Sequence, residues 1–315
     1  MNDITRQLRE RARQLLQEGT VDCVIGYAQG SVPMQEQPFF AYTPEEADKL
    51  VWTGFCTNNL ANFLIKRSGK NAIVAQGCVS RNIVGLIKEN QVQRENVYIL
   101  GMHSPGMLDA HKVQNHFHGR TIVQVEEEGQ DIIVKGMDFE ERLPRKKFKR
   151  DNCFTCTHRN AVLYDEFIGQ EGPQTGGGNI DNVAAPWEKL DSDERWAEFE
   201  ETFKDCIRCY ACRNVCPLCY CDVCFVDENN PQWVGKSLHE PDVYTFHILR
   251  AFHCAGRCTD CGACESACPV GIKMRRLTSK IEKDIRQLYD YQPGLDLETP
   301  APLSLYRPND PDVAE

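Results

Sequence analysis

Two stretches of the sequence repeat one cysteine pattern, and no other feature constrains the chain as tightly. Each stretch has four cysteines spaced C-x2-C-x2-C-x3-C, with a proline directly after the last one. The two sets are Cys206, Cys209, Cys212 and Cys216 before Pro217, and Cys258, Cys261, Cys264 and Cys268 before Pro269. A short turning loop brings its first three thiols to one centre, while the fourth is carried past on the segment that follows. The spacing therefore predicts two metal–sulfur sites that exchange their fourth ligands.

This spacing is typical of bacterial ferredoxins with two [4Fe-4S] clusters. We expect the first cluster to be bound by Cys206, Cys209, Cys212 and Cys268. The second is then bound by Cys258, Cys261, Cys264 and Cys216. The alternative is a pair of zinc ribbons, but these favour paired C-x2-C units without Cys-Pro and would leave half of the thiols unused.

Composition supports metal binding over disulfides. The chain has 17 cysteines in 315 residues, an odd number that fits poorly with complete pairing. Its charged, helical N-terminus lacks the apolar core of a secretory signal, and no apolar run approaches the roughly 20 residues that cross a bilayer. We therefore expect a cytoplasmic protein without a membrane span, whose thiols stay reduced. A net charge of −10 argues against nucleic acid as a partner.

The first half of the chain alternates helical and strand patterns, which predicts an α/β domain over residues 1–168 with a parallel sheet. Helices are expected at 1–19, 43–50, 58–69 and 80–90. Strands are expected at 21–27, 71–76 and 96–102, followed by a hairpin over 121–136 that turns at Glu128-Gly129. The helix over 43–50 carries Thr43, Pro44 and Glu46, the residues of a capping box.

The second half is organised around the two cysteine stretches. Residues 169–190 are rich in glycine and proline and are predicted to be a linker. We expect residues 191–290 to form an α+β domain of the bacterial dicluster ferredoxin type, with helices at 191–206, 240–257 and 275–291. Residues 291–315 are proline-rich and are predicted to be an extended tail laid along a partner.

The remaining cysteines form two further groups. Cys56, Cys78, Cys153 and Cys156 lie in the first domain and suffice in number for a third [4Fe-4S] cluster. Cys219, Cys221, Cys224 and Cys254 lie beside the first ferredoxin-like stretch. They are interpreted either as an additional metal site, a fourth cluster or a zinc ion, or as buried thiols that pack beside a cluster. Cys23 lies within an apolar strand pattern and is expected in the core.

Two segments of the first domain carry a resemblance to a known family. They are "GKNAIVAQGCVSRNIVGLIKENQVQRENVYILGM" and "RDNCFTCTHRNAVLYDEFIG". Over residues 20–170 the chain resembles the beta subunits of deazaflavin-reducing hydrogenases and related formate dehydrogenases. The resemblance implies a subunit that holds one [4Fe-4S] cluster, here through Cys56, Cys78, Cys153 and Cys156, and that often binds FAD. It also implies electron transfer between the clusters of a catalytic partner subunit and a soluble hydride carrier.

The chain departs from that family at two points. Asn58 and Asn59 stand where flavin-binding members have a glycine-rich turn, which argues against binding of FAD and of the carrier. His103 stands near the end of the third strand, where a cysteine is expected, and is interpreted as a hydrogen-bonding loop residue.

His247, in the helix between the clusters, is expected to pack or to form a hydrogen bond rather than to bind metal. The basic run Arg142–Arg150 is a solvated loop by default, with partner docking or cluster charge compensation as the sharper hypothesis.

The sequence thus predicts an iron–sulfur electron-transfer subunit of a multi-subunit oxidoreductase, of the formate dehydrogenase, hydrogenase or heterodisulfide-reductase type. In such an anaerobic complex the chain relays single electrons, and the catalytic chemistry takes place in a partner subunit. One alternative is a flavin-dependent reductase of a nicotinamide or deazaflavin carrier. Another is a redox-sensing protein whose clusters are structural.

Overall fold

A five-stranded sheet organises the first half of the chain. The computed structural model describes residues 3–174, 180–306, 308 and 310. The strand order is β2-β1-β3-β4-β8. The strands are β1 (Cys23–Gln29), β2 (Glu36–Ala41), β3 (Asn71–Ala75), β4 (Val97–Met102) and β8 (Glu166–Ile168). All neighbours pair in parallel except β2, which runs antiparallel to β1 at the edge. The mixed α/β class of this half is therefore confirmed.

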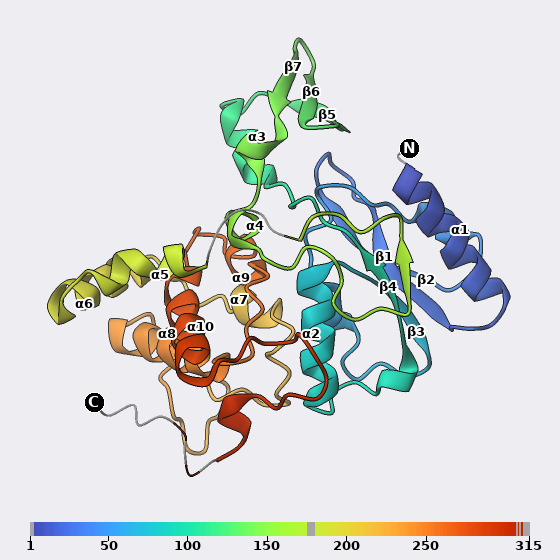
Figure 1. Cartoon of the computed structure of the whole chain (residues 1–315). Coiled ribbons are helices and arrows are strands. Elements are labelled where there is room, and N and C mark those ends of the chain that lie inside the picture. The colour runs from blue at the N-terminus through green and yellow to red at the C-terminus, as the bar shows by residue number, and fades with distance from the viewer. Residues whose placement is uncertain (1–2, 175–179, 307, 309, 311–315) are drawn as a thin grey trace.

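Helices cover both faces of this sheet. Helix α1 (Asp3–Gln17) buries Leu8, Ala12 and Leu15, and α2 (Gly77–Lys88) lies on the opposite side of the strands (Figure 1). Every residue of β3 is buried, as expected for a strand between two helical layers. This arrangement directs the carboxyl ends of β3 and β4 toward the second half of the chain (Figure 1).

Two helices predicted in this half are wrong in length. The segment expected over 43–50 contains only a 3-10 turn, Glu46–Lys49, and the segment over 58–69 contains only Leu60–Phe63. The Asn59 side chain accepts a hydrogen bond from Ala61 N (3.2 Å), which caps a turn too short for an α-helix. Burial of Leu60 and Ala61 in the sheet core outweighs the helical periodicity of the sequence. Cys56 consequently lies in a turn and not at a helix start.

A small antiparallel lobe projects from the sheet at the top of Figure 1. It consists of α3 (Ala110–His116), β5 (Ile122–Glu128), β6 (Asp131–Gly136) and β7 (Glu140–Pro144). The predicted hairpin is confirmed, with Gly129 at φ +61° in its turn. After the 3-10 turn Arg145–Phe148, the short helix α4 (Asp151–Thr155) returns the chain to the molecule and delivers Cys153 and Cys156.

The second half of the chain is helical. Its helices are α5 (Asp181–Glu188), α6 (Ser192–Phe203), α7 (Ala211–Asn214), α8 (Glu240–His253), α9 (Ala263–Ser266) and α10 (Arg275–Tyr289). Residues 191–290 are all described and contain no strand, so the β part of the predicted α+β domain is wrong. The cysteine loops take up the residues that strands would need. Within the described residues, no helix combines the length and apolarity needed to cross a membrane.

The two cysteine loops have the same backbone shape. The second and fourth residues after the first cysteine adopt positive φ in both: Arg208 and Tyr210 in one loop, Asp260 and Gly262 in the other. Left-handed residues turn a short chain sharply, and here each pair leads directly into the four-residue helix α7 or α9. The sequence repeat is therefore also a structural repeat.

The predicted linker and tail are both attached to the molecule where they are described. Residues 175–179 of the linker lie outside the described residues. Residues 181–188 of the linker form α5, which pairs with α10 through Arg286–Asp181 and Lys283–Glu188. The described tail crosses α2, where Arg81 Nε donates to the Pro293 carbonyl (2.9 Å). The tail thus contacts α2 of its own chain through Pro293 and Thr299, whose carbonyl accepts from Lys88. Leu305 and Tyr306 are exposed, and the expected contact of the tail with a partner stays a prediction.

Candidate metal centres

The first predicted set of cysteines lines one cavity. Cys206 and Cys209 approach from the first loop, Cys212 from the start of α7, and Cys268 from the end of the second loop. Apolar side chains supply most of the remaining lining, namely Ile207, Phe246, Val270, Ile272 and Met274, and Arg208, Tyr210 and His247 supply the rest. The backbone N–H groups of Arg208 and Ile272 point at Cys206 Sγ (3.4 Å) and Cys268 Sγ (3.3 Å). N–H···S contacts of this kind stabilise thiolates, so the donors fit a thiolate-bound metal.

The second predicted set lines another cavity. Cys258, Cys261 and Cys264 approach from the second loop, and Cys216 from the end of the first. The structure thus brings together both sets of four, including the exchanged fourth cysteines Cys216 and Cys268. Metal ligation by these thiols remains a prediction. Cys254 and Arg250, which were not assigned to this set, line the same cavity.

Burial keeps these thiols protonated, as expected for metal ligands that give up their protons only when a cation binds. Burial raises the pKa of the Cys258 thiol well above its usual value, and it raises the pKa of Cys264 to about 12. Such thiols are neutral at pH 7 and unreactive until a metal displaces their protons. A soft metal is the partner that several converging thiolates select.

A third cavity contains three of the four cysteines predicted in the first domain. Cys78, Cys153 and Cys156 line it, and the Met107 N–H points at Cys153 Sγ (3.2 Å). Cys56 does not line it; its thiol lies in the sheet core and accepts a hydrogen bond from Thr53 N (3.3 Å). The misplaced helix start explains the difference, since Cys56 was expected on an element that does not form. The structure therefore brings together only three of these four.

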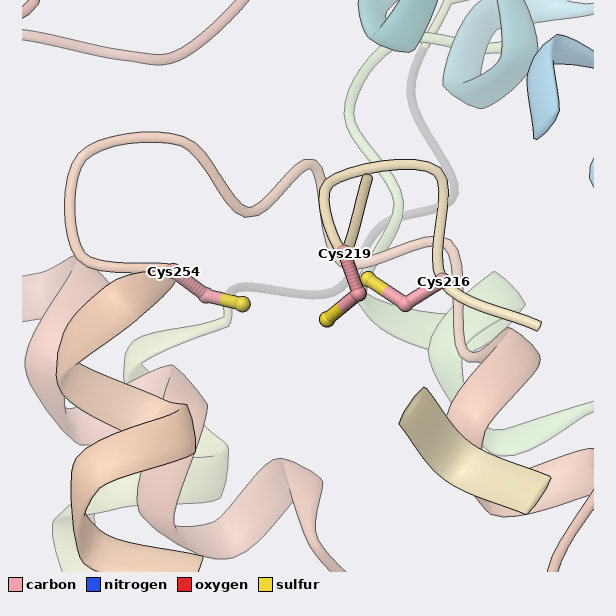
Figure 2. A group of neighbouring side chains, drawn as sticks. All are labelled: Cys216, Cys219 and Cys254. Carbon is pink, nitrogen blue, oxygen red and sulfur yellow. The ribbon is translucent and has the colours of Figure 1, made fainter. Parts of the chain in front are cut away.

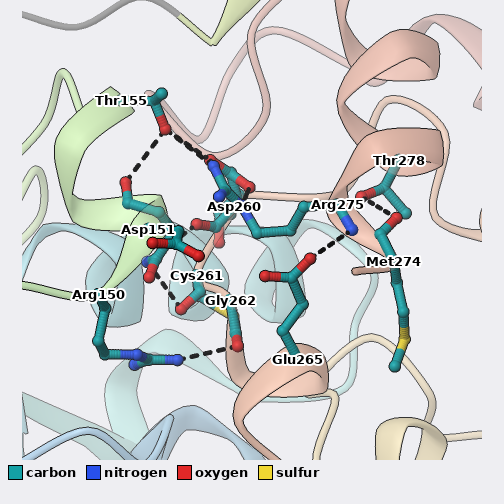
Figure 3. Close-up of polar contacts among 12 residues, drawn as sticks. Arg150, Asp151, Thr155, Asp260, Cys261, Gly262, Glu265, Met274, Arg275 and Thr278 are labelled. Atoms are coloured by element: carbon teal, nitrogen blue, oxygen red, sulfur yellow. Dashed lines mark hydrogen bonds and ion pairs between the residues drawn. The ribbon is translucent and has the colours of Figure 1, made fainter. Parts of the chain in front are cut away.

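The second and third cavities adjoin each other. Cys258 and Cys261 line both of them. Figure 3 shows how α4 is tied to the second cysteine loop. Arg150 Nη2 donates to the Gly262 carbonyl (2.8 Å), and Arg275, paired with Asp260, donates to Thr155 Oγ1 (2.8 Å). Asn152 Nδ2 also donates to the Cys261 carbonyl (3.0 Å). The helix that carries Cys153 is thereby fixed against the loop that carries Cys261.

One face of α8 serves the first and second cavities. His247, Arg250 and Cys254 are spaced by three and four residues and therefore lie on the same side of the helix. His247 Nε2 lies 3.2 Å from Cys206 Sγ, and its ring stacks on Phe203. Burial and the nearby Arg250 lower the pKa of His247 to about 3, so the ring is neutral at pH 7 and has one N–H to donate. The expected hydrogen-bonding role of His247 is confirmed.

Arg250 is a residue that sequence reasoning missed. It is 5% exposed, and its Nη2 donates to the Cys212 carbonyl (3.0 Å). Burial alone would lower the pKa of Arg250, but the thiols of Cys264 and Cys216 raise it well above its usual value. The only signal in the sequence was its helical spacing from His247 and Cys254.

A further group of three thiols overlaps the second cavity, which Cys216 and Cys254 of this group also line. The Sγ atoms of Cys216, Cys219 and Cys254 lie within 4.8 Å of one another (Figure 2). The predicted group was Cys219, Cys221, Cys224 and Cys254. Of these four, only Cys219 and Cys254 are brought together. Thiolates bound to one tetrahedral ion at about 2.3 Å lie roughly 3.8 Å apart, which suits this spacing better than a cubane does. Cys216 thus has two candidate uses, one in this group and one in the second cavity.

The two departures from the flavin-binding pattern have structural roles. Asn58 Nδ2 donates to the Glu36 carbonyl (3.4 Å), and Asn59 caps the 3-10 turn that follows. His103 Nδ1 lies 2.6 Å from Asn160 Oδ1, as expected for a hydrogen-bonding loop residue. An open cavity lies beside Asn58, lined also by Ser31, Glu36 and Arg150 among others.

The fold and the cavities define a class of protein in which several thiol-lined cavities adjoin an α/β sheet, a lining that fits metal binding. No protein-family model matches the chain. A formate dehydrogenase beta subunit described as F420-dependent, from Methanocaldococcus jannaschii, is 25% identical over 94% of this chain and 93% of its own. The beta subunit of F420-dependent formate dehydrogenase 1 from Methanococcus maripaludis is 26% identical over 92% of this chain and 91% of its own.

These two relatives confirm the predicted resemblance to formate dehydrogenase beta subunits, since F420 is a deazaflavin. The similarity extends over nearly the whole chain, beyond the segment of residues 20–170 that suggested it. A solved structure of the F420-reducing [NiFe] hydrogenase complex from Methanosarcina barkeri contains a chain 17% identical, with a TM-score of 0.41, covering 65% of this chain and 90% of that one. A TM-score this low does not establish a shared fold.

Proposed function

We propose that this chain is an iron–sulfur electron-transfer subunit of a multi-subunit oxidoreductase, with formate dehydrogenase as the most strongly supported complex. The single observation that carries the proposal is the convergence of two complete sets of four cysteines in two cavities, with Cys216 and Cys268 exchanged between loops. The two formate dehydrogenase subunits that resemble nearly the whole chain support the choice of complex.

The arrangement of the cavities supports a relay. The first cavity is joined to the second by Arg250, which bonds to Cys212 and lines the second cavity. The second is joined to the third by Cys258 and Cys261. Bound [4Fe-4S] clusters supply one-electron chemistry at such sites. The chain's own residues hold the ligands, exclude water with apolar side chains, and set the local charge.

The partners of such a relay are a catalytic subunit at one end and a soluble carrier at the other. The relatives' dependence on F420 supports a deazaflavin as that carrier. The open cavity beside Asn58 and Glu36 supports the alternative of a flavin-dependent reductase, because it lies at the carboxyl-terminal side of β1. Flavin released by acid from the purified chain would favour the flavin-dependent reductase. Absence of flavin would favour the relay.

Metal quantitation tests the proposal. The chain is purified without oxygen, and its iron, sulfide and zinc are measured. We expect about eight irons for two clusters, about twelve if the third cavity is loaded and about sixteen with a fourth cluster. A colourless protein, or one with zinc in place of iron, would refute the relay. Clusters that dithionite cannot reduce reversibly would instead favour a structural or sensing role.

Paired substitutions test the exchange of ligands. Cys212→Ser and Cys268→Ser are expected to remove the same cluster, identified by its electron paramagnetic resonance signal, although they lie in different loops. Cys258→Ser and Cys216→Ser are expected to remove the other. Cys23→Ser is the matched control, because Cys23 is a buried strand residue outside all three cavities. Loss of different signals by Cys212→Ser and Cys268→Ser would disprove the exchange.

A further inference from the structure

Arg250 is a buried cation without an acidic partner. Its side chain is 5% exposed, and its Nε is buried without a hydrogen-bond partner. Within the part of the chain that the structure describes, no carboxylate forms an ion pair with it. The other strongly buried arginines of the second half differ: Arg275 pairs with Asp260 (2.5 Å), and Arg208 lies 3.9 Å from Asp242. Burying an unpaired charge is costly, so Arg250 calls for a counter-charge.

The surroundings of Arg250 indicate where this counter-charge lies. On one side, Nη2 donates to the carbonyl of Cys212, and Nη1 lies 4.0 Å from Met274 Sδ. Cys212 and Met274 both line the first cavity. On the other side, Arg250 itself lines the second cavity together with Cys216 and Cys264. Arg250 therefore stands between the two cysteine sets and is in contact with both.

We propose that Arg250 is the shared counter-charge of the two ferredoxin-like clusters and acts as a positioning residue that tunes their reduction. The inference rests on the proposed function, since it requires clusters in both cavities. Four thiolates around an iron–sulfur core give each cluster a negative charge, which grows by one on reduction. A fixed cation beside both cavities stabilises the added electron on either cluster and weakens the repulsion between two reduced ones.

Arginine suits this role better than lysine would. A guanidinium stays protonated even when buried, so reduction of a cluster requires no proton uptake at this residue. Its planar donors can also bond to the Cys212 carbonyl while the charge faces the second cavity. A purely structural role for Arg250, as a donor to that carbonyl, makes a different prediction. It would affect folding and iron content without a selective effect on the potentials.

The test is a redox titration of the full-length chain, purified without oxygen and followed by electron paramagnetic resonance. We compare Arg250→Gln, which removes the charge, with Arg250→Lys, which keeps it. Arg145→Gln is the control, because Arg145 is equally buried (4% exposed) but pairs with Glu127 (2.9 Å) in the lobe. In Arg250→Gln we expect the midpoints of both ferredoxin-like clusters to shift to more negative potential. In Arg250→Lys and in the control Arg145→Gln, we expect both midpoint potentials to stay near those of the unaltered chain.

Each other outcome has a definite meaning. Clusters with unchanged midpoints in Arg250→Gln overturn the role of Arg250 and leave the relay intact, whereas an unaltered chain without clusters overturns the relay itself. If Arg250→Gln fails to retain its clusters, the midpoint potentials of Arg250→Lys decide whether Arg250 acts through its charge. Retained clusters with near-normal midpoints in the lysine variant support a charge role, and their loss there too refutes it.

Discussion

At the scale of single residues, what surrounds a buried cysteine separates packing from metal binding. Cys23 and Cys56 are buried in the sheet core and line none of the thiol-rich cavities. Cys258 and Cys264 are only half-buried, but their thiols share a cavity with others. Burial alone therefore does not identify a ligand, whereas convergence of several thiols on one space does.

Cys216 offers the sharpest test at this scale, because it belongs both to the second cavity and to the group with Cys219 and Cys254. If it binds the second cluster, Cys219→Ser and Cys254→Ser each keep both ferredoxin-like clusters, while Cys216→Ser loses about four irons. Iron and zinc analysis of the three variants distinguishes the two uses. Zinc that is present in the unaltered chain and lost in Cys216→Ser as well as in Cys219→Ser and Cys254→Ser would assign Cys216 to a tetrahedral zinc site.

At the scale of elements, α10 holds the entry to the second cysteine loop through a carboxyl group. Glu282 Oε1 accepts hydrogen bonds from Gly256 N (3.0 Å) and Cys258 N (3.3 Å), and Oε2 is buried without a partner. Burial raises the pKa of Glu282 to about 8, so the group is protonated at pH 7 in the folded chain. In the unfolded chain a glutamate has a pKa of about 4.3.

This difference in pKa predicts a pH dependence of stability. Between about pH 4.3 and 8 the folded state holds a proton that the unfolded state has released, so stability falls as pH rises, by up to about 1.4 kcal/mol per unit. Glu282→Gln mimics the protonated acid and is expected to flatten this dependence. Anaerobic denaturant unfolding from pH 5 to 8 measures it. An equal slope in both proteins would show that Glu282 does not titrate as proposed.

The length of a helix or strand decides whether its position can be predicted from the sequence. The strands β1, β3 and β4 and the helices α2, α6, α8 and α10 were predictable, because each has enough consecutive patterned residues to form by its own periodicity. The segments around Glu46 and Leu60 were not, because a short periodic stretch yields to the packing of the sheet core. The exchange of Cys216 and Cys268 followed from local spacing. The position of Arg250 depends on where two loops meet, which no local pattern encodes.

At the scale of the whole molecule, the two halves are joined at the point where the second and third cavities meet. Arg275 and Asp260 form the most buried ion pair of this junction, with side-chain exposures of 6% and 14% (Figure 3). Through Thr155, Arg275 also holds α4, which carries Cys153. The junction therefore fixes both the contact between the two halves of the chain and the spacing of the second and third cavities.

We expect Arg275→Met to destabilise the chain by roughly 3–5 kcal/mol, because it leaves Asp260 buried without its partner. Asp260→Asn in the same chain should recover part of this loss, since the uncompensated charge is then removed. Unfolding midpoints of the two single variants and the double variant give the coupling energy. Strictly additive effects would mean that Arg275 and Asp260 do not act as a coupled pair.

The basic run Arg142–Arg150 divides between the interior and the surface. Arg150 is buried, donates to the Gly262 carbonyl and lines the third cavity, so this end of the run serves the junction. Arg145 is buried as well, but it pairs with Glu127 of the lobe. Lys146 and Lys147 are exposed on the lobe, close in sequence to α4. If the lobe docks a partner, these two lysines supply the positive charge.

Replacing Lys146 and Lys147 by glutamate is therefore expected to weaken binding of an acidic partner subunit several-fold at low salt, mainly by slowing association, and to have little effect at high salt. Lys149 is left unaltered because its side chain packs against Gly106 and is half-buried. The control exchanges Lys49 and Lys70, which are exposed on the α/β half, for glutamate and so changes the net charge equally. Equal weakening by both pairs would mean that net charge acts without a docking site on the lobe, and unchanged affinity in the first pair would remove the lobe from the interface.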